Sequence, residues 1–352
     1  MRYRLLGRSG LRVSELCLGT MTFGDAWGWG ADKDASRAQY EAYREAGGNF
    51  IDTANFYTGG QSEEIIGDLM QGHREQIVLA TKFTLFQRQG DPNSAGNGRK
   101  SMMDAVHASL KRLKTDYIDL YWVHAWDQMT PIDELMRGFD DLVRQGKILY
   151  AGVSDFPAWK VAQVNTLAEL QGWTRFVGLQ VPYSLTRRDI ERELVPAANS
   201  LGLGITPWGP LDGGALTGKC SRKDLDDKTP ADPTKPAENR SGMVKAGLTE
   251  RKLEIADKVK EVAERIGKTP SQVALRWVMQ QPGVTSTILG ARTLKKLQDN
   301  LGAREFELDA STLDELHEAS KIDLGFPTDF LNGPNVTQFM GGGVHVEGTR
   351  GL

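Results

Sequence analysis

Four residues whose side chains can bind or transfer a proton follow short apolar runs in this sequence. Asp52 comes directly after Phe50-Ile51, and Tyr57 lies a few residues beyond it. Lys82 and His124 each end another apolar run. Continuous apolar runs are typical of strands that are buried on both faces. We therefore expect Asp52, Lys82 and His124 at the carboxyl ends of strands, with Tyr57 on the loop above them, where functional residues are often found.

Together these four groups could exchange a proton with a carbonyl oxygen. An aspartate and a lysine at buried strand ends are costly unless paired, and Asp52 and Lys82 on adjacent strands can pair. An ammonium group favours the anionic form of a nearby phenol, so we expect the pKa of Tyr57 to fall. Tyr57 could then donate its proton to a carbonyl oxygen while hydride reaches the carbon, and His124 could hydrogen-bond the same oxygen.

Each of these residues also has a structural explanation. A single histidine at a strand end, such as His124, is more often a hydrogen-bonded structural residue. One Asp–Lys pair is usually only a salt bridge, and Tyr57 taken alone could belong to the surface or the core. Four residues of the required types at one end of consecutive strands nevertheless favour the catalytic interpretation.

Alternating strands and helices must position these groups. We expect a short opening hairpin around the turn at 7–10, followed by eight units of strand then helix, which predict an α/β fold: a single (β/α)₈ TIM barrel with the hairpin covering its amino-terminal end. An open doubly wound sheet is the alternative, but the chain lacks its Gly-x-Gly-x-x-Gly fingerprint. The expected strands are 16–20, 49–53, 77–82, 117–123, 148–153, 177–181, 204–208 and 285–289. The expected helices are 34–48, 62–71, 99–113, 131–145, 157–171, 189–201, 249–267 with 270–280, 293–302 and 311–320.

Two regions interrupt this alternation. Residues 212–248 form a long polar insertion after the seventh strand, and segments of that length in compact domains are usually functional lids or disordered. Residues 326–352 follow the last expected helix and include Gly341-Gly342-Gly343. We predict one barrel domain over 1–325, with 326–352 as a tail over the barrel mouth or as disorder.

Composition limits the classes of partner. The chain of 352 residues has a formal net charge of -3, which gives no argument for a nucleic-acid or membrane partner. No apolar run approaches the roughly 18 residues of a membrane span. Two cysteines and no evident secretory leader predict a cytoplasmic protein. The five histidines show no metal-ligand spacing, so we expect no metal and a small molecule as the partner.

Several motifs together resemble the aldo-keto reductases, over roughly residues 3 to 320, and in particular the branch that includes the potassium-channel β-subunits. Any one of these motifs is weak, but the set is specific. They are Gly10-Leu11-Arg12-Val13-Ser14, Phe50-Ile51-Asp52-Thr53-Ala54, Ala80-Thr81-Lys82, Asp119-Leu120-Tyr121-Trp122-Val123-His124, Gly146-Lys147, Gly152-Val153-Ser154, Leu179-Gln180-Val181-Pro182-Tyr183-Ser184, Leu216-Thr217-Gly218-Lys219 and Gly290-Ala291-Arg292.

The resemblance implies NADPH-dependent reduction of aldehydes and ketones. It assigns Tyr57 as the acid–base group, Asp52 and Lys82 as the pair that tunes it, and His124 as the group that orients the carbonyl. The family's steroid double-bond reductases have glutamate at the position of His124, so histidine favours carbonyl chemistry. Two alternatives stay open: a cofactor-binding regulatory protein with weak turnover, and a barrel hydrolase with paired carboxylates, which the lysine beside Asp52 fits poorly.

The resemblance also implies a set of cofactor-binding residues. Ser154 and Gln180 would hold the nicotinamide carboxamide, and Trp208 would stack on the nicotinamide ring. The family usually has asparagine after the serine, whereas Asp155 can only accept hydrogen bonds. Arg292 and Lys296 would meet the 2′-phosphate, at a strand-to-helix junction suited to an anion. The remaining implied cofactor residues are Gly19, Thr20, Met21, Gly209, Pro210, Leu211, Gly213, Leu216, Lys219, Gly290, Ala291, Asp299 and Asn300, the last two beside the adenine.

Aromatic residues on the same loops could form a substrate wall. Phe23, Trp27 and Trp29 follow the first barrel strand, Phe56 follows the second, and Trp126 follows the fourth. Such residues would suit an apolar or aromatic carbonyl compound. They could equally be ordinary packing beneath the loops.

Overall fold

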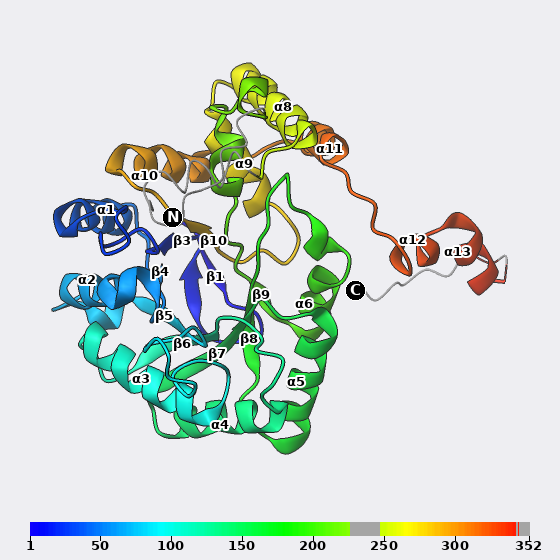
Figure 1. The fold of residues 1–352 in the computed structure, drawn as a ribbon. Coiled ribbons are helices and arrows are strands. Elements are labelled where there is room, and N and C mark those ends of the chain that lie inside the picture. Colours follow the sequence, from blue (N-terminus) through cyan, green and yellow to red (C-terminus); the bar gives the residue numbers. More distant parts are fainter. Residues whose placement is uncertain (226–246, 343, 345–352) are drawn as a thin grey trace.

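Eight parallel strands form the centre of the molecule, in a computed structural model that describes residues 1–225, 247–342 and 344. Their order within the described chain is β10-β3-β4-β5-β6-β7-β8-β9, with helices arranged around them (Figure 1). Every predicted strand is confirmed, with ends that differ by a few residues. The strands are β3 (Leu16–Gly19), β4 (Phe50–Asp52), β5 (Val78–Phe83), β6 (Ile118–Val123), β7 (Ile148–Ser154), β8 (Phe176–Gln180), β9 (Gly204–Ile205) and β10 (Thr287–Leu289).

Backbone hydrogen bonds close the sheet between β9 and the residues before and within β10. Thr285 N donates to Ile205 O at 2.8 Å, and Ile288 N donates to Pro207 O at 2.9 Å. All residues of β5 and β6 are buried, as expected for strands with side chains facing both the barrel interior and the surrounding helices. The closed barrel that the sequence predicted is therefore the observed architecture.

The helices that surround the barrel bury apolar residues on one face. Residues Leu135, Phe139 and Leu142 of α4, for example, repeat at helical spacing and are all buried. Asp32 caps the first helix by accepting a hydrogen bond from Ala35 N at 2.8 Å. The helices are α1 (Lys33–Glu45), α2 (Gln61–Leu69), α3 (Arg99–Leu113), α4 (Ile132–Arg144), α5 (Ala158–Gln171), α6 (Leu194–Leu201), α8 (Glu250–Ile266), α9 (Pro270–Met279), α10 (Leu294–Leu301), α11 (Ala310–Ala319), α12 (Thr328–Leu331) and α13 (Pro334–Met340).

One predicted helix is wrong in its first half. Residues 189–201 do not form a continuous helix: a 3₁₀ turn at Asp189–Glu191 is separated from α6 by Glu193. The backbone of Glu193 has φ −140 and ψ −39, outside helical values. Pro196 falls in the first turn of α6, where the missing N–H of proline is tolerated. The helix therefore begins later than its apolar pattern suggested.

Trp122 fills the interior of the barrel and dictates which residues surround it. A Cβ atom added to Gly152 would lie 2.3 Å from the Trp122 ring, and one added to Gly178 would lie 2.8 Å from it. The hairpin of β1 (Tyr3–Leu5) and β2 (Arg12–Ser14) contributes Leu6 and Val13 to the same buried cluster as Trp122. The predicted cover on the amino-terminal end is confirmed, and its apolar side chains extend the barrel core.

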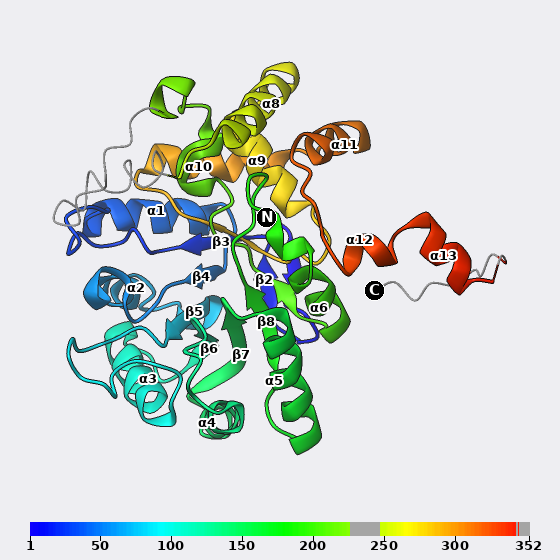
Figure 2. The ribbon, with the colours of Figure 1, turned by 45° about the vertical axis from the view of Figure 1, so that its right-hand side comes forward.

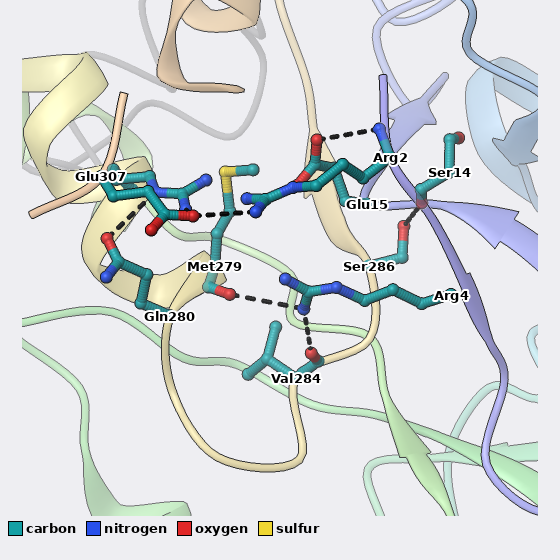
Figure 3. Close-up of polar contacts among 10 residues, drawn as sticks. Arg2, Arg4, Ser14, Glu15, Met279, Gln280, Val284, Ser286 and Glu307 are labelled. Atoms are coloured by element: carbon teal, nitrogen blue, oxygen red, sulfur yellow. Dashed lines mark hydrogen bonds and ion pairs between the residues drawn. The ribbon is translucent and has the colours of Figure 1, made fainter. Parts of the chain in front are cut away.

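A network of charged residues fastens the hairpin to the last barrel helices (Figure 3). Arg2 forms ion pairs with Glu15 at 2.9 Å and with Glu307 at 2.8 Å. Glu307 also pairs with Arg276 of α9 at 2.9 Å, although Arg276 is 1% exposed. Arg4 donates to Val284 O at 2.7 Å, next to β10. The contacts of Arg4 with Val284 and of Arg2 with Glu307 join the first residues of the chain to segments 280 and 305 residues away.

The last described residues extend away from the barrel as α12 and α13 (Figures 1 and 2). The Arg192 guanidinium donates to Asp323 O at 3.1 and 3.0 Å and holds the start of this arm beside α6. The domain division at 325 stays a prediction. Residues 226–246 of the predicted insertion and 345–352 of the predicted tail lie outside the described residues.

No helix among the described residues is both long and apolar enough to cross a bilayer. The cytoplasmic location inferred from the sequence stays a prediction.

Candidate active site

Lys82 is the centre of a buried polar cluster at the carboxyl ends of β4 and β5. Its side chain is fully buried and its Nζ forms an ion pair with Asp52 Oδ2. The same Nζ donates to Thr53 O at 2.8 Å and to Tyr57 Oη at 3.1 Å. A buried ammonium with three acceptors is fully compensated. The structure thus brings together the first three of the predicted proton-handling residues.

His124, directly after β6, lies beside Tyr57. The two ring centroids are 5.8 Å apart, with the planes at 82° in an edge arrangement. His124 N donates to Phe83 O at 3.2 Å, which fixes the backbone of this loop against β5. Its Nδ1 is buried and has no hydrogen-bond partner among the described residues. The fourth predicted residue therefore lies where it can reach the same small volume as the Tyr57 hydroxyl.

The pKa of Tyr57 corrects one expectation. Burial raises the pKa of the Tyr57 phenol, and the nearby Lys82 ammonium lowers it by less, so the net direction is upward rather than the predicted fall. Burial lowers the pKa of Lys82, but Asp52 and Tyr57 together raise it by more. Near neutral pH the phenol holds its proton and the amine is an ammonium, which is the state a proton donor requires.

His124 is neutral in this environment. Burial, with a smaller contribution from the Lys82 charge, lowers the pKa of His124 to about 3. A neutral imidazole has one N–H donor and one acceptor nitrogen. It can therefore donate a hydrogen bond to a substrate oxygen without competing with Tyr57 as the proton source.

A tight turn places Tyr57 over Lys82. Tyr57–Gly60 form a 3₁₀ turn in which Thr58 has φ 49 and Gly59 has φ 66. A positive φ is uncommon for a β-branched residue such as threonine. The Thr58 hydroxyl donates to Phe23 O at 2.7 Å and supports this conformation. The sequence indicated a polar bend here but gave no signal for its strained backbone.

Gln180 has a partner that sequence reasoning missed. Its Nε2 donates to Asp52 Oδ1 at 2.9 Å, so Asp52 is held by Lys82 on one oxygen and by Gln180 on the other. Ser154 and Gln180 are aligned neighbours on β7 and β8. Asp52 and Gln180 are far apart in sequence, and only the closed barrel brings their strands to face each other across the interior.

Asp155 and Trp208 lie together at the next strand ends. Asp155 has φ 50, a left-handed conformation that aspartate tolerates better than most residues. Its Oδ1 accepts a hydrogen bond from Trp208 Nε1 at 3.3 Å. Trp208 follows β9 and is half-buried. The carboxylate thus orients the indole that the sequence assigned to ring stacking.

The implied cofactor residues between Gly209 and Lys219 lie in a series of turns after β9. Gly209, Gly213 and Gly214 all have positive φ, at 65, 67 and 125, and permit the chain to reverse repeatedly. Asp212 anchors this loop: it accepts a hydrogen bond from Thr186 at 2.9 Å and forms a 2.8 Å ion pair with Lys252 of α8. Pro210 and Leu216 are buried, Leu211 is half-buried and Lys219 is exposed.

After β3, the predicted segment is packed closely against its neighbours. A Cβ atom on Gly19 would lie 2.6 Å from Ile288 Cγ2, so no larger residue fits there. The Thr20 hydroxyl donates to Asp52 O at 3.0 Å. Met21 is exposed. Thr20 therefore holds the backbone at the end of β4, where Asp52 lies.

The segment after β10 combines an exposed cation with a helix amino terminus. Arg292 is exposed and precedes α10, whose cap Thr293 accepts a hydrogen bond from Lys296 N at 3.4 Å. Gly290 has open space around its Cα, and Ala291 O accepts a hydrogen bond from Thr22 at 2.8 Å. Asn300 is buried. The Asp299 carboxylate instead accepts hydrogen bonds from Thr269 and Gln272 of the neighbouring helix cap, at 3.1 and 3.3 Å.

Two aromatic groups lie on the loops at this end of the barrel. The ring centroid of Trp27 lies 5.7 Å from the ring centroids of both Trp29 and Phe56, and the ring centroids of Phe56 and Phe86 are 5.0 Å apart. Phe23, which the sequence analysis also considered for this wall, is fully buried in the main core, so the packing alternative holds for this residue. Phe86 was missed, because it lies in a loop without strand or helix periodicity.

The second aromatic group lies on the loop after β6 and around the start of α5. The ring centroid of Trp126 lies 6.2 Å from that of Phe156 and 5.6 Å from that of Trp159. Lys160 Nζ lies 4.4 Å from the Trp159 ring centroid and 5.0 Å from that of Trp126, in cation–π contact with both. Trp159 is 56% exposed, which is unusual for tryptophan. Its position in the first turn of a helix concealed it from sequence reasoning.

Comparison with known proteins identifies the family. Residues 15–321 match the model of the aldo/keto reductase family. A norsolorinic acid reductase of Aspergillus flavus is 37% identical over 340 residues, covering 94% of this chain and 84% of the relative. The aryl-alcohol dehydrogenase [NADP(+)] of Phanerodontia chrysosporium is 38% identical over 338 residues, covering 90% of this chain and 85% of the relative.

The chain belongs to the aldo/keto reductase family. An uncharacterized oxidoreductase of Bacillus subtilis is also 38% identical over 330 residues, covering 90% of this chain and 95% of that protein. The family resemblance stated from the motifs is confirmed, and the protein is an oxidoreductase. The finer resemblance to the potassium-channel β-subunit branch stays a prediction.

The residues of this aldo/keto reductase fit a nicotinamide dinucleotide. The glycine turns from Gly209, the open Gly290 and the exposed Arg292 leave backbone and charge accessible along one end of the barrel. Trp208 presents a flat, half-buried indole that Asp155 holds through a hydrogen bond. Across the described ranges, no group of three or more His, Cys, Asp or Glu side chains is arranged to hold a metal ion.

Proposed function

We propose that this protein reduces aldehydes or ketones to alcohols with NADPH. The observation that carries the proposal is the contact between Lys82 Nζ and Tyr57 Oη, 3.1 Å apart and directly beside the His124 ring. A protonated phenol, a buried ammonium and a neutral imidazole around one small volume are what protonation of a carbonyl oxygen requires.

The side chains divide the work of proton delivery. Tyr57 donates its proton to the carbonyl oxygen, and the Lys82 ammonium stabilises the phenolate that remains. Asp52 and Thr53 O hold Lys82 in position, while His124 donates a hydrogen bond that orients the substrate oxygen. When bound, NADPH supplies the hydride that the carbonyl carbon accepts. One hydride and one proton complete the alcohol, and the phenolate regains its proton from solvent.

The same strand ends would hold the cofactor. Ser154 and Gln180 would contact the nicotinamide carboxamide, with Trp208 against the ring. Asp155 can accept a hydrogen bond from the carboxamide NH₂ but cannot donate one. Arg292 at the start of α10 would bind the 2′-phosphate that distinguishes NADPH from NADH. The name of the Phanerodontia chrysosporium relative, with its NADP(+), supports this cofactor.

Aromatic carbonyl compounds are the substrate class that we infer. The Trp27–Phe56 group and the Trp126–Trp159 group both border the strand ends that carry the four proton-handling residues. Flat aromatic side chains recognise flat aromatic substrates by stacking. The named relatives include an aryl-alcohol dehydrogenase and norsolorinic acid reductases, which is consistent with this class.

The second candidate function is a cofactor-binding regulatory protein with weak turnover. It needs the same four residues, so the site does not separate the two. Turnover does: ordinary enzymes reach roughly 1–10³ per second, and a rate orders of magnitude lower with every aldehyde tested would favour regulation. A barrel hydrolase is disfavoured, because Asp52 has both oxygens occupied by Lys82 and Gln180.

Tyr57→Phe tests the proposal. The variant keeps the ring and loses only the hydroxyl, so NADPH should still bind, measured by quenching of tryptophan fluorescence. Reduction of an aromatic aldehyde should fall about 10²–10⁴-fold. Unchanged aldehyde reduction with intact NADPH binding would refute the role of Tyr57. Tyr150→Phe, at a half-buried tyrosine that packs against the Trp122 cluster, is the control.

A further inference from the structure

The first turn of α2 carries two buried polar side chains, Ser62 and Glu63, that the proposed reaction does not use. Both are completely buried. The helix begins at Gln61, directly after the turn that carries Tyr57. Because a buried hydroxyl or carboxylate costs free energy unless it is hydrogen-bonded, the partners of these two side chains indicate what they hold in place.

Ser62 joins the ends of β3 and β4. The Thr53 and Ser62 hydroxyl oxygens are 2.8 Å apart, and Ser62 Oγ donates to Thr20 O at 2.8 Å. Thr20 Oγ1 in turn donates to Asp52 O at 3.0 Å. The Thr20 and Ser62 hydroxyl oxygens are also 2.8 Å apart, so the hydroxyls of Thr53, Ser62 and Thr20 form one buried chain, in which each has a single proton to donate.

Thr53 connects this hydroxyl chain to the ammonium of Lys82. Its carbonyl accepts the hydrogen bond from Lys82 Nζ at 2.8 Å, while its hydroxyl contacts Ser62. On the other side, Ser62 N donates to Thr58 Oγ1 at 3.1 Å. Thr58 is the residue with positive φ that follows Tyr57. Ser62 therefore contacts the residue that holds Lys82 through its hydroxyl, and the residue with positive φ in the Tyr57 turn through its backbone N–H.

Glu63 secures the same helical turn to the next strand. Its Oε1 accepts a hydrogen bond from the Thr81 hydroxyl at 2.6 Å, and its Oε2 pairs with Arg112 Nε at 2.7 Å. Thr81 immediately precedes Lys82 on β5. Two consecutive side chains thus join the start of α2 to the residues that follow β3 and β4, to β5 and to α3.

We propose that Ser62 is a positioning residue: its hydroxyl, with Glu63 securing the same turn, fixes the Tyr57 hydroxyl against Lys82. The inference rests on the proposed function, in which Tyr57 is the proton donor. Misplacing a reacting group by about 1 Å can cost on the order of 10²-fold in rate. Glu63 still holds the helix when Ser62 is removed, so we expect a loss of about tenfold.

The experiment compares Ser62→Ala with Ser109→Ala. Ser109 on α3 is also completely buried, but its hydroxyl has no partner within the described chain. Each variant is assayed for kcat with an aromatic aldehyde and with an ortho-quinone, and for NADPH affinity by fluorescence. The quinone accepts a hydride to give a hydroquinone monoanion, which is stable without a proton from the protein, so its reduction does not need Tyr57.

Ser62→Ala should lose about tenfold in kcat for the aldehyde, while the quinone rate and NADPH affinity change by less than about twofold. Ser109→Ala should match the wild type in all three measurements. Equal losses for aldehyde and quinone in Ser62→Ala, or no loss, would overturn the positioning role.

Tyr57→Phe separates this inference from the proposed function. If Tyr57→Phe loses aldehyde reduction and keeps quinone reduction, the proposed function stands whatever Ser62→Ala does. If Tyr57→Phe reduces the aldehyde normally, the proposed function itself fails.

Discussion

The side chains around Lys82 show how burial changes the chemistry of single residues. Desolvation keeps the proton on Tyr57 against the pull of the Lys82 charge, and it keeps His124 neutral. Proximity to the Lys82 charge, taken alone, predicted a fall in the pKa of Tyr57, whereas the pKa is raised. The result is a site whose donor is protonated and whose imidazole is uncharged across the neutral range.

Acid should therefore destabilise the wild type in part through His124. Burial lowers its folded-state pKa to about 3, below the ordinary value near 6.5 of the unfolded chain. As pH falls from about 6.5, the unfolded state takes up a proton that the folded state does not, so stability falls, by at most about 1.4 kcal/mol per pH unit for one group. Urea unfolding of the wild type and His124→Gln between pH 7 and 4 checks this. Parallel pH dependence of the two proteins would contradict a neutral, buried His124.

Strand-to-helix junctions are the elements that place each functional group. Every barrel strand delivers its polar residue to the same end, because parallel strands in a closed sheet share their carboxyl edge. The loop that follows then decides orientation, as the Tyr57 turn and the Asp212-anchored turn show. Function at this scale depends on a few loop residues held by buried hydrogen bonds.

The junction of β10 and α10 should select NADPH over NADH. Arg292→Ala removes an exposed guanidinium suited to a phosphate, and we expect NADPH affinity to fall about 10–100-fold. NADH lacks the 2′-phosphate and should lose much less. Fluorescence titration with both cofactors measures the ratio. Lys295→Ala, which removes an exposed cation from the same helical turn, is the control. Equal losses for NADPH and NADH would exclude the phosphate role of Arg292.

At the scale of the molecule, the two ends of the barrel have different tasks. The carboxyl end carries the residues that we propose for proton transfer and cofactor binding. The amino-terminal end is closed by the hairpin, by Leu6 against Trp122, and by the ion pairs of Arg2, Arg276 and Glu307 (Figure 3). Changes at that end should alter stability and leave catalysis intact.

Glu307→Ala should lower the free energy of unfolding more than Glu305→Ala does, because the buried Arg276 guanidinium loses an acceptor. Glu305→Ala is the matched control: its side chain is 61% exposed against 63% for Glu307, and its one ion pair is at 3.8 Å. It should change the unfolding free energy by less than about 0.5 kcal/mol. Denaturant unfolding gives both values, and kcat for an aldehyde should be unchanged. A kcat loss in Glu307→Ala would contradict the separation of the two ends.

By itself, the sequence predicted the barrel, its eight strands and the four residues that we propose for proton transfer. Those features depend on local patterns: apolar runs for strands, helical periodicity, and polar residues at strand ends. The sequence also showed that Asp155 replaces the asparagine that the family usually has at this position. Residues such as Lys82 were recognisable because a buried charge at the end of a strand needs a partner.

Only the tertiary structure decided the rest. The Gln180–Asp52 hydrogen bond, the Ser62 hydroxyl chain and the burial of Phe23 depend on which strands face each other and on how closely loops pack. The direction of the Tyr57 pKa shift depends on desolvation, which is a property of the surrounding volume. Contacts between distant residues and the low dielectric around buried groups arise only when the barrel closes. The spacing of residues along the chain therefore does not predict them.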